Sequence, residues 1–258
     1  MDYAYTYWEG TLPLINKLCI GSITKIFGQR HIHTTPDNID KYIKIPTNIK
    51  NTLHVGFRAD YIRAALLKKY GGWWFDCDIF LLRNPEILVN LAPKIWQENK
   101  PDIHGKKRIC CGVLYSHADS EWLVRIESEL KKININNNDV WTIGQSVYIN
   151  FFESVKNLAL GPFTDFYPII AEDWNTLWNG AFEISPDTYG IQFYTSKLRR
   201  KLQDEHGHAK IILNLESVKE LISLFPDSFL ANHFKEPAII NRQNIWPNEV
   251  LAVQKIAI

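Results

Sequence analysis

The hydrophobic residues between Asp60 and Tyr70 follow the period of an amphipathic helix. Those that recur at steps of three and four residues are Ile62, Ala65, Leu66 and the aliphatic stem of Lys69. Gly71 follows this pattern directly, and glycine is common at a helix C-terminus because it adopts a left-handed conformation without steric cost. We therefore predict a helix from about Asp60 that ends at Tyr70.

The next stretch, Trp73 to Leu82, is rich in aromatic and branched residues and stops at Arg83 to Pro85, which is typical of a strand. Side chains alternate along a strand, so Asp76 and Asp78 would point to one face, about 7 Å apart. Two like charges in so apolar a stretch need a cation opposite them, and Mg²⁺ or Mn²⁺ binds such oxygen atoms readily. A metal site is predicted here. Two solvent-facing acids, or one acid paired with Arg63, are the alternative.

Predicted strands and helices alternate along the first third of the chain. The patterns predict a strand at residues 3–8, a helix at 14–27, a strand at 30–35 and a short helix at 39–45, ahead of the helix and strand described above. This alternation is typical of an α/β fold, in which helices flank a largely parallel sheet. Ligands bind such sheets at the carboxyl ends of the strands, so Asp76 and Asp78 would lie at a ligand-binding edge.

The second half of the chain gives weaker signals. Strands are predicted at 94–97 and 109–115, helices at 121–132, 142–156 and 217–225, and an asparagine-rich loop at 133–139. We find no internal repeat, low-complexity tract or clear linker. The sequence therefore predicts a single domain over residues 1–258.

The composition indicates a globular protein with no general attraction to nucleic acid. Of the 258 residues 46% are hydrophobic and 22% are charged, and the formal net charge is +1. The four cysteines have no CxxC spacing, which is typical of reduced thiols in a cytosolic protein. Neither a signal peptide nor an apolar run of membrane-spanning length is evident. We therefore expect a cytoplasmic protein without nucleic-acid partners.

Several motifs with a fixed order lie in the first third of the chain. Asp60 and Arg63 form D-x-x-R, the run from Tyr70 reads Y-G-G-W-W, and Asp76 and Asp78 form D-x-D. In this order and spacing the sequence resembles the capsular polysaccharide synthesis glycosyltransferases. It is also similar to the wider group of DXD sugar transferases, which includes the initiation-type α-mannosyltransferases.

Shorter matches support this resemblance along most of the chain. They are the segment Tyr7-Trp8-Glu9-Gly10, the segment from Asn38 to Pro46, the pair Gly161-Pro162 and the late histidine His233. One departure is Cys110-Cys111, where relatives usually have an asparagine before the Gly-Val-Leu strand.

The resemblance implies a GT-A fold, in which a Rossmann-type mixed sheet is flanked by helices in a single domain. Residues up to about 115 would bind a nucleotide-sugar, and residues from about 116 to 258 would bind the acceptor. The implied reaction transfers a hexose from UDP or GDP to a glycan or lipid-linked oligosaccharide during capsular or surface polysaccharide synthesis, with retention of anomeric configuration. A lipid-linked acceptor would bring the protein to the inner face of the plasma membrane.

The resemblance also implies roles for individual residues. Asp78 would hold Mn²⁺ or Mg²⁺ against the donor diphosphate, and Asp76 would contact the metal or the ribose and sugar hydroxyls. Asp60 and Arg63 would hold donor hydroxyls or phosphate, with a surface i,i+3 ion pair as the alternative. The predicted catalytic residues are therefore Asp76, Asp78 and Arg63, and the metal would act as a Lewis acid on the leaving diphosphate.

Three further site assignments also have structural alternatives. His233 would lie beside the metal, although a histidine in an apolar segment is commonly a structural residue. Tyr7 and Trp8 would stack on the nucleotide base, although large aromatic residues are also common in the core.

Two other functions stay open at this point. A D-x-D after an apolar strand also serves the aspartyl-phosphate chemistry of phosphatases and phosphotransferases, but those enzymes have a threonine two places further on, where this chain has Phe80. A non-catalytic sugar-binding or regulatory protein would keep the same fold. The intact D-x-x-R and D-x-D motifs favour an enzyme.

Overall fold

The computed structural model describes residues 2–89, 94–98, 108–133, 143–154, 160–200 and 208–235, and these form two compact units. Unit 1 contains Met1–Gly10, Gln29–Asp76 and Pro85–Pro162, and unit 2 contains Thr11–Gly28, Cys77–Asn84 and Phe163–Ile258. The chain therefore alternates between the units, and the boundary falls inside the D-x-D triplet, between Asp76 and Cys77. The single domain expected over residues 1–258 stays a prediction.

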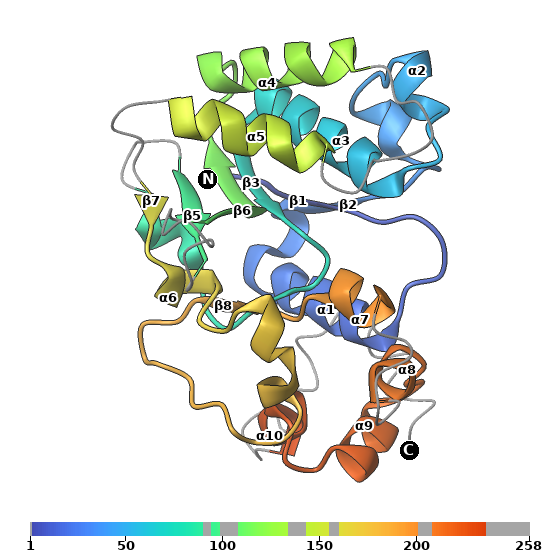
Figure 1. Cartoon of the computed structure of the whole chain (residues 1–258), viewed down its shortest axis with the longest axis vertical. Coiled ribbons are helices and arrows are strands. Elements are labelled where there is room, and N and C mark those ends of the chain that lie inside the picture. Colours follow the sequence, from blue (N-terminus) through green and yellow to red (C-terminus); the bar gives the residue numbers. More distant parts are fainter. Residues whose placement is uncertain are drawn as a thin grey trace. The chain divides into compact units, whose positions relative to one another are not determined.

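A six-stranded mixed sheet forms the centre of unit 1 (Figure 1). Its strands, in spatial order, are β2 (His31–Thr34), β1 (Ala4–Tyr7), β3 (Gly72–Phe75), β6 (Ile109–Ser116), β5 (Lys94–Gln97) and β7 (Leu160–Gly161). β1 pairs in parallel with β2 and β3, whereas β6 runs antiparallel to β3 and β5. The predicted α/β class with a mixed, helix-flanked sheet is confirmed.

Three helices of unit 1, α3 (Val55–Tyr70), α4 (Glu121–Lys132) and α5 (Ile143–Ser154), lie together over one face of this sheet (Figure 1). Alternate strand residues point toward them, so that Tyr5 and Trp74 share a core with Leu66 of α3 and Tyr148 of α5. Only a 3-10 turn (Ile39–Lys41) stands within residues 39–45, where the sequence predicted a short helix, and the short α2 (Thr47–Lys50) follows beyond that range.

Helix α3 is longer than predicted but ends where the glycine signal placed its end. It begins at Val55, and Gly71 follows Tyr70 with φ 66° while its N–H donates to the carbonyl oxygen of Leu67 at 2.8 Å. A left-handed residue at this position closes the last turn of the helix. The chain then enters β3 at once, which keeps the end of the helix close to the start of the strand.

The strand predicted at Trp73 to Leu82 is wrong in its middle. β3 ends at Phe75, residues 76–78 form a turn, and β4 (Ile79–Leu81) pairs antiparallel with β8 (Gly190–Gln192) in a separate two-stranded sheet of unit 2. The N–H of Asp76 still donates to Gly112 in the first sheet, at 2.7 Å, whereas the carbonyl oxygen of Asp78 accepts from Phe193. Because the chain changes sheets here, strand alternation does not place Asp76 and Asp78 on one face.

Unit 2 is built around α1 (Leu14–Phe27) and the β4–β8 pair. Its other helices are α6 (Phe163–Phe166), a 3-10 segment (Ala171–Leu177), α7 (Thr195–Arg200), α8 (His208–Leu213), α9 (Val218–Leu224) and α10 (Phe229–Lys235). Phe80 of β4, Leu18 of α1 and Leu230 of α10 belong to its hydrophobic core.

The other predicted elements are also found. The helices expected at 121–132, 142–156 and 217–225 correspond to α4, α5 and α9, and the loop expected at 133–139 lies almost entirely outside the described residues. Within the described residues, none of the helices is long and apolar enough to cross a membrane.

Replacing Gly72 with alanine should destabilise unit 1. Gly72 has φ +92°, and a Cβ there would overlap the backbone oxygen of Tyr3, which accepts the Trp73 N–H at 2.8 Å. Backbone strain alone costs about 1–3 kcal/mol, and the overlap adds to it. Gly28→Ala is the control, because Gly28 has φ +57° but open space around it. Urea unfolding should show the larger loss for Gly72→Ala, and equal losses would contradict the role of the overlap.

Candidate active site

The carboxyl ends of β2, β1 and β3 meet at one edge of the sheet because the three strands are parallel. The residues that follow them are Thr35, Trp8 and Asp76. Helix α3 packs over β1 and β3, and it carries the D-x-x-R residues Asp60 and Arg63. This is the edge at which ligands bind α/β sheets, and it lies wholly within unit 1.

Arg63 is the cation at the centre of this edge, and only 5% of it is exposed. Its Nη2 lies 3.0 Å from Oδ1 of Asp76 and 3.3 Å from Oδ1 of Asp60. The guanidinium also lies over the rings of Trp74 and Tyr148, at 5.2 and 5.5 Å from their centroids. The pair of Asp60 and Arg63 is therefore buried and not the surface ion pair that was the alternative.

The two oxygens of Asp76 have different environments. Oδ1 accepts hydrogen bonds from Nη2 of Arg63 at 3.0 Å and from Nε1 of Trp74 at 2.8 Å. Oδ2 has no hydrogen bond from the described residues, and 32% of the Asp76 side chain is exposed. Arg63 and Trp74 thus orient the carboxylate so that one oxygen stays accessible to a ligand.

This accessible oxygen fits the way in which proteins bind Mg²⁺ or Mn²⁺. Such ions are often held by one or two carboxylates, with water and substrate phosphates as the remaining ligands. In the described part of the chain, His, Cys, Asp and Glu side chains do not gather in groups of three or more that could hold a metal. A site built from Asp76 would therefore depend on the phosphates of a bound nucleotide.

Asp60 is a buried acid of this edge, with only 8% of the residue exposed. Burial raises its pKa to about 6, although Arg63 acts to lower this pKa and Asp76 adds to the rise. Tyr148 of α5 donates to the backbone oxygen of Asp60 at 2.7 Å, and the carboxylate lies against Gly144, where a Cβ would overlap Oδ2. The first two turns of α5 therefore hold Asp60 in place.

Asp78 belongs to unit 2, where its carboxylate accepts several hydrogen bonds. Oδ2 accepts from the backbone N–H of Thr195 at 2.9 Å and from its hydroxyl at 3.3 Å, and Oδ1 accepts from Nε2 of Gln192 at 3.3 Å. Asp78 is 7% exposed. It thus fixes the start of α7 to the end of β8, and its role as the principal metal ligand stays a prediction.

His233 lies in an aromatic cluster on α10. Its ring meets those of Phe80 and Phe234 edge-on, with centroids 5.0 and 5.4 Å apart, and stacks on Phe229 at 6.0 Å. Burial lowers its pKa to about 4, with a smaller contribution from Lys25. This is the structural environment that was the alternative for His233, and its contact with a metal stays a prediction.

Tyr7 and Trp8 differ in burial at the end of β1. Tyr7 is 6% exposed and belongs to the core under α3, so the core alternative describes its ring. Trp8 is half-buried just beyond the strand, and its backbone N–H donates to Thr34 at 3.1 Å. Of the two aromatic residues predicted to stack on a base, Trp8 is the more exposed.

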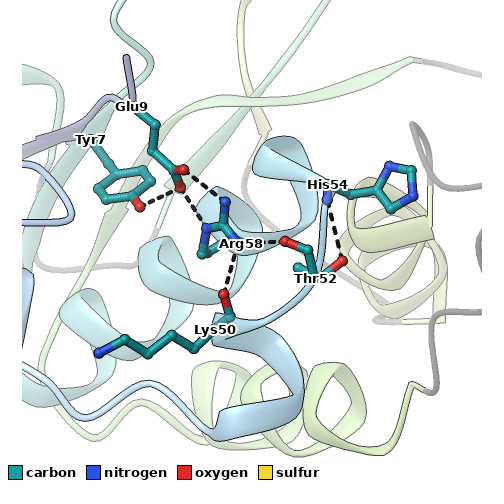
Figure 2. Close-up of polar contacts among 6 residues, drawn as sticks. All are labelled: Tyr7, Glu9, Lys50, Thr52, His54 and Arg58. Atoms are coloured by element: carbon teal, nitrogen blue, oxygen red, sulfur yellow. Dashed lines mark hydrogen bonds and ion pairs between the residues drawn. The ribbon is translucent and has the colours of Figure 1, made fainter.

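Sequence reasoning missed a second charged group at the same edge. Figure 2 shows the carboxylate of Glu9 meeting the guanidinium of Arg58 and the hydroxyl of Tyr7. Burial acts to raise the pKa of Glu9. Hydrogen bonds from Arg58 and Tyr7 outweigh this effect and hold the pKa below its ordinary value. Glu9 lies in the segment Tyr7-Trp8-Glu9-Gly10, which forms part of the resemblance. Arg58 lies in none of the motifs, and its partner Glu9 is distant in the sequence.

Cys111 also borders the site, at the point where the sequence departs from its relatives. Its side chain is buried on the face of β6 that packs toward α3, and burial raises the pKa of its thiol. A neutral, apolar thiol therefore stands next to Arg63, where an asparagine was expected from the resemblance.

The family model described as capsular polysaccharide synthesis protein matches residues 5–151 of this chain, which is more than half of its length. Two solved structures are similar. One is a glycosyltransferase involved in the glycosylation of the major capsid of PBCV-1, with 14% identity and a TM-score of 0.49 over 78% of this chain and 100% of that one. The other is the PaToxG glycosyltransferase, with 10% identity and a TM-score of 0.39 over 90% and 86%. No curated protein matches.

The raised pKa of Asp60 predicts a pH dependence of stability. A carboxyl that keeps its proton up to about pH 6 when folded, but loses it near pH 4 when unfolded, stabilises the fold less as pH rises. We expect a loss of about 1 kcal/mol from this group between pH 5 and pH 7. Urea unfolding of wild type and Asp60→Asn at both pH values should give this difference.

Wild type must be compared with Asp60→Asn because other groups titrate in the same pH range. Burial lowers the pKa of His31, His33 and His233, so these residues add stability as pH rises through about 6.5. Their contribution is common to wild type and Asp60→Asn and cancels in the difference. A difference that does not change between pH 5 and pH 7 would show that Asp60 keeps an ordinary pKa.

Gly144→Ala should displace Asp60, because the new methyl group would occupy the space of its carboxylate. Overpacking of this kind costs about 1–3 kcal/mol. Gly56 is the matched control: it is also the second residue of a helix, and a Cβ there meets no atom within 4 Å. Urea unfolding should show a clear loss for Gly144→Ala only, and similar stabilities of the two variants would refute the packing argument.

Proposed function

We propose that this chain transfers a hexose from a UDP- or GDP-sugar to a hydroxyl of a growing surface glycan and requires a divalent cation. The chain belongs to the capsular polysaccharide synthesis family of glycosyltransferases. The observation that supports a cation most directly is the accessible oxygen of Asp76, which Arg63 and Trp74 orient at the carboxyl end of β3. A carboxylate that is held in this way is ready to bind a metal without reorganising.

Asp76 and Asp78 are the residues that would hold Mn²⁺ or Mg²⁺. When bound, the ion supplies a Lewis acid that neutralises charge on the leaving nucleoside diphosphate. The guanidinium of Arg63 lies 3.0 Å from Oδ1 of Asp76 and orients that carboxylate. Asp60 stays ionised above about pH 6 and shares the charge of Arg63.

The donor would lie along the carboxyl ends of β1 and β3. Trp8, half-buried and just beyond β1, is the residue we assign to the nucleotide base, because an indole ring stacks on any base. Asp76, beyond β3, is assigned to the diphosphate end. The two strands are adjacent in the sheet, so base and diphosphate would bind to neighbouring strand ends.

The reaction class is proposed as retaining, with an oxygen of the leaving phosphate serving as the base for the acceptor hydroxyl. The acceptor would be a glycan or a lipid-linked oligosaccharide, and the enzyme would work in the cytoplasm, at the inner face of the plasma membrane where the acceptor is lipid-linked. These finer points rest on the family resemblance of the motifs.

The decisive test incubates the protein with a panel of UDP- and GDP-sugars and measures nucleotide release, once with Mn²⁺ and once with EDTA. Release that is specific to one donor and is lost in EDTA is the expected result. Binding of a donor without release would instead indicate a sugar-binding protein that has lost turnover. Failure of every donor to bind would overturn the proposal.

Asp76→Asn should abolish metal-dependent binding of the nucleoside diphosphate, because it removes the charge while keeping the shape of the side chain. We expect transfer to fall by about a hundredfold or more, and calorimetry with Mn²⁺ and UDP or GDP should show the loss of binding. Asp40→Asn is the control, because Asp40 makes an exposed ion pair with Lys50 at 2.9 Å. Asp78→Asn tests the second ligand in the same assay, with unfolding measured in parallel because Asp78 also anchors Thr195.

A further inference from the structure

Glu9 and Arg58 form a nearly dry ion pair with fork-like geometry (Figure 2). Nε of Arg58 lies 2.5 Å from Oε1 of Glu9, and Nη2 lies 2.7 Å from Oε2. Only 14% of the Arg58 side chain and 15% of the Glu9 side chain are exposed. Two parallel hydrogen bonds between planar groups fix both the distance and the relative orientation of the two side chains.

Arg58 also holds the end of α2 and the loop that leads from it into α3. Its Nη1 donates to the carbonyl oxygen of Lys50 at 3.0 Å and to that of Thr52 at 2.6 Å. Together with the two bonds to Glu9, these contacts use four of the five N–H groups of a guanidinium. Most of the N–H groups of Arg58 therefore bind protein oxygens, so its guanidinium is not available to bind a phosphate.

The pair stands next to the residues that we assign to the donor. Glu9 directly follows Trp8, and Arg58 precedes Asp60 by two residues on α3. Tyr7 donates its hydroxyl hydrogen to Glu9, so the segment that carries Trp8 is fixed on both sides. One ion pair thus joins the turn after β1, the loop before α3 and the first turn of α3.

Stability alone is a poor explanation for such a pair. Burying two charges costs nearly as much as their attraction returns, so apolar residues of similar size could do as well. What an ion pair adds is geometry, because its hydrogen bonds are satisfied in one arrangement only. A fixed arrangement matters at a binding edge more than in the rest of the core.

Building on the proposed function, we propose that Glu9 and Arg58 are a positioning pair for the donor: they set the place of Trp8 relative to α3 and thereby the affinity for the nucleotide part of the donor. Neither residue needs to touch the nucleotide. Losing the pair should weaken binding of the nucleoside diphosphate by about ten- to a hundredfold, because a misplacement of about 1 Å can already cost an enzyme about a hundredfold in rate.

The chain contains a control for this proposal in Arg30 and Glu86. These residues also form a forked pair within unit 1, with Nη2 of Arg30 3.3 Å from Oε2 of Glu86. Arg30 directly precedes β2 and donates to the backbone oxygen of Asp2, ahead of β1, at 2.8 Å. This second pair therefore lies at the amino ends of β1 and β2, at the edge of the sheet opposite the site.

The experiment measures the affinity of the full chain for UDP and for GDP with Mn²⁺, by calorimetry, together with unfolding in urea. Glu9→Gln and Arg58→Ala should weaken binding by ten- to a hundredfold, whereas Arg30→Ala and Glu86→Gln should change it by less than about twofold. Glu9→Gln keeps the shape of the side chain and is the informative variant if Arg58→Ala does not fold. In transfer assays the Glu9 variant should raise KM for the donor far more than it lowers kcat.

Two outcomes would overturn the positioning proposal, and they are distinguishable. If the wild-type protein binds UDP or GDP and the Glu9 and Arg58 variants bind it equally well, the pair is structural only and the proposed function stands. If the wild-type protein binds neither nucleotide, the proposed function fails and the positioning proposal fails with it.

Discussion

The burial of Arg63 is the constraint on which the rest of the site depends. An arginine that is 5% exposed needs negative charge beside it, and Asp60 and Asp76 supply that charge from α3 itself and from the end of β3. The rings of Trp74 and Tyr148 flank the guanidinium and help to keep water away from it. Asp76 is therefore oriented before any ligand arrives, since its Oδ1 both balances the charge of Arg63 and accepts a hydrogen bond from Nη2 of that residue.

Much of the fold could be predicted because its signals are local. The periodic pattern and the glycine stop of α3 lie within a few residues of each other, and so do the alternating residues of β1 and β2. The break after β3 could not be found in this way, because the aromatic and branched residues continue through Asp76 and Asp78 without a change in composition. What ends the strand is a distant partner: Ile79 pairs with Gln192, and no local pattern announces that pairing.

The site was predictable to the extent that its residues lie in one motif. Asp60, Arg63 and Asp76 could be found together because a helix, a tight turn and a strand bring them to the same edge. Glu9 and Arg58 could not be paired from the sequence, since 49 positions separate them and neither residue type is unusual. Gly144 gave no signal either, because its importance comes from the carboxylate of Asp60 that packs against it.

Helix α3 carries both arginines of the site, and its geometry explains how one element can serve two strand ends. Arg58 and Arg63 are five residues apart, which on an α-helix turns their side chains by about 140° relative to one another. The first meets Glu9 beyond β1, and the second meets Asp76 beyond β3. Because β1 and β3 are neighbours in the sheet, a single rigid helix fixes the two strand ends at once. A shift of α3 by one turn would break both ion pairs. The position of this helix along the sheet therefore determines the shape of the binding edge.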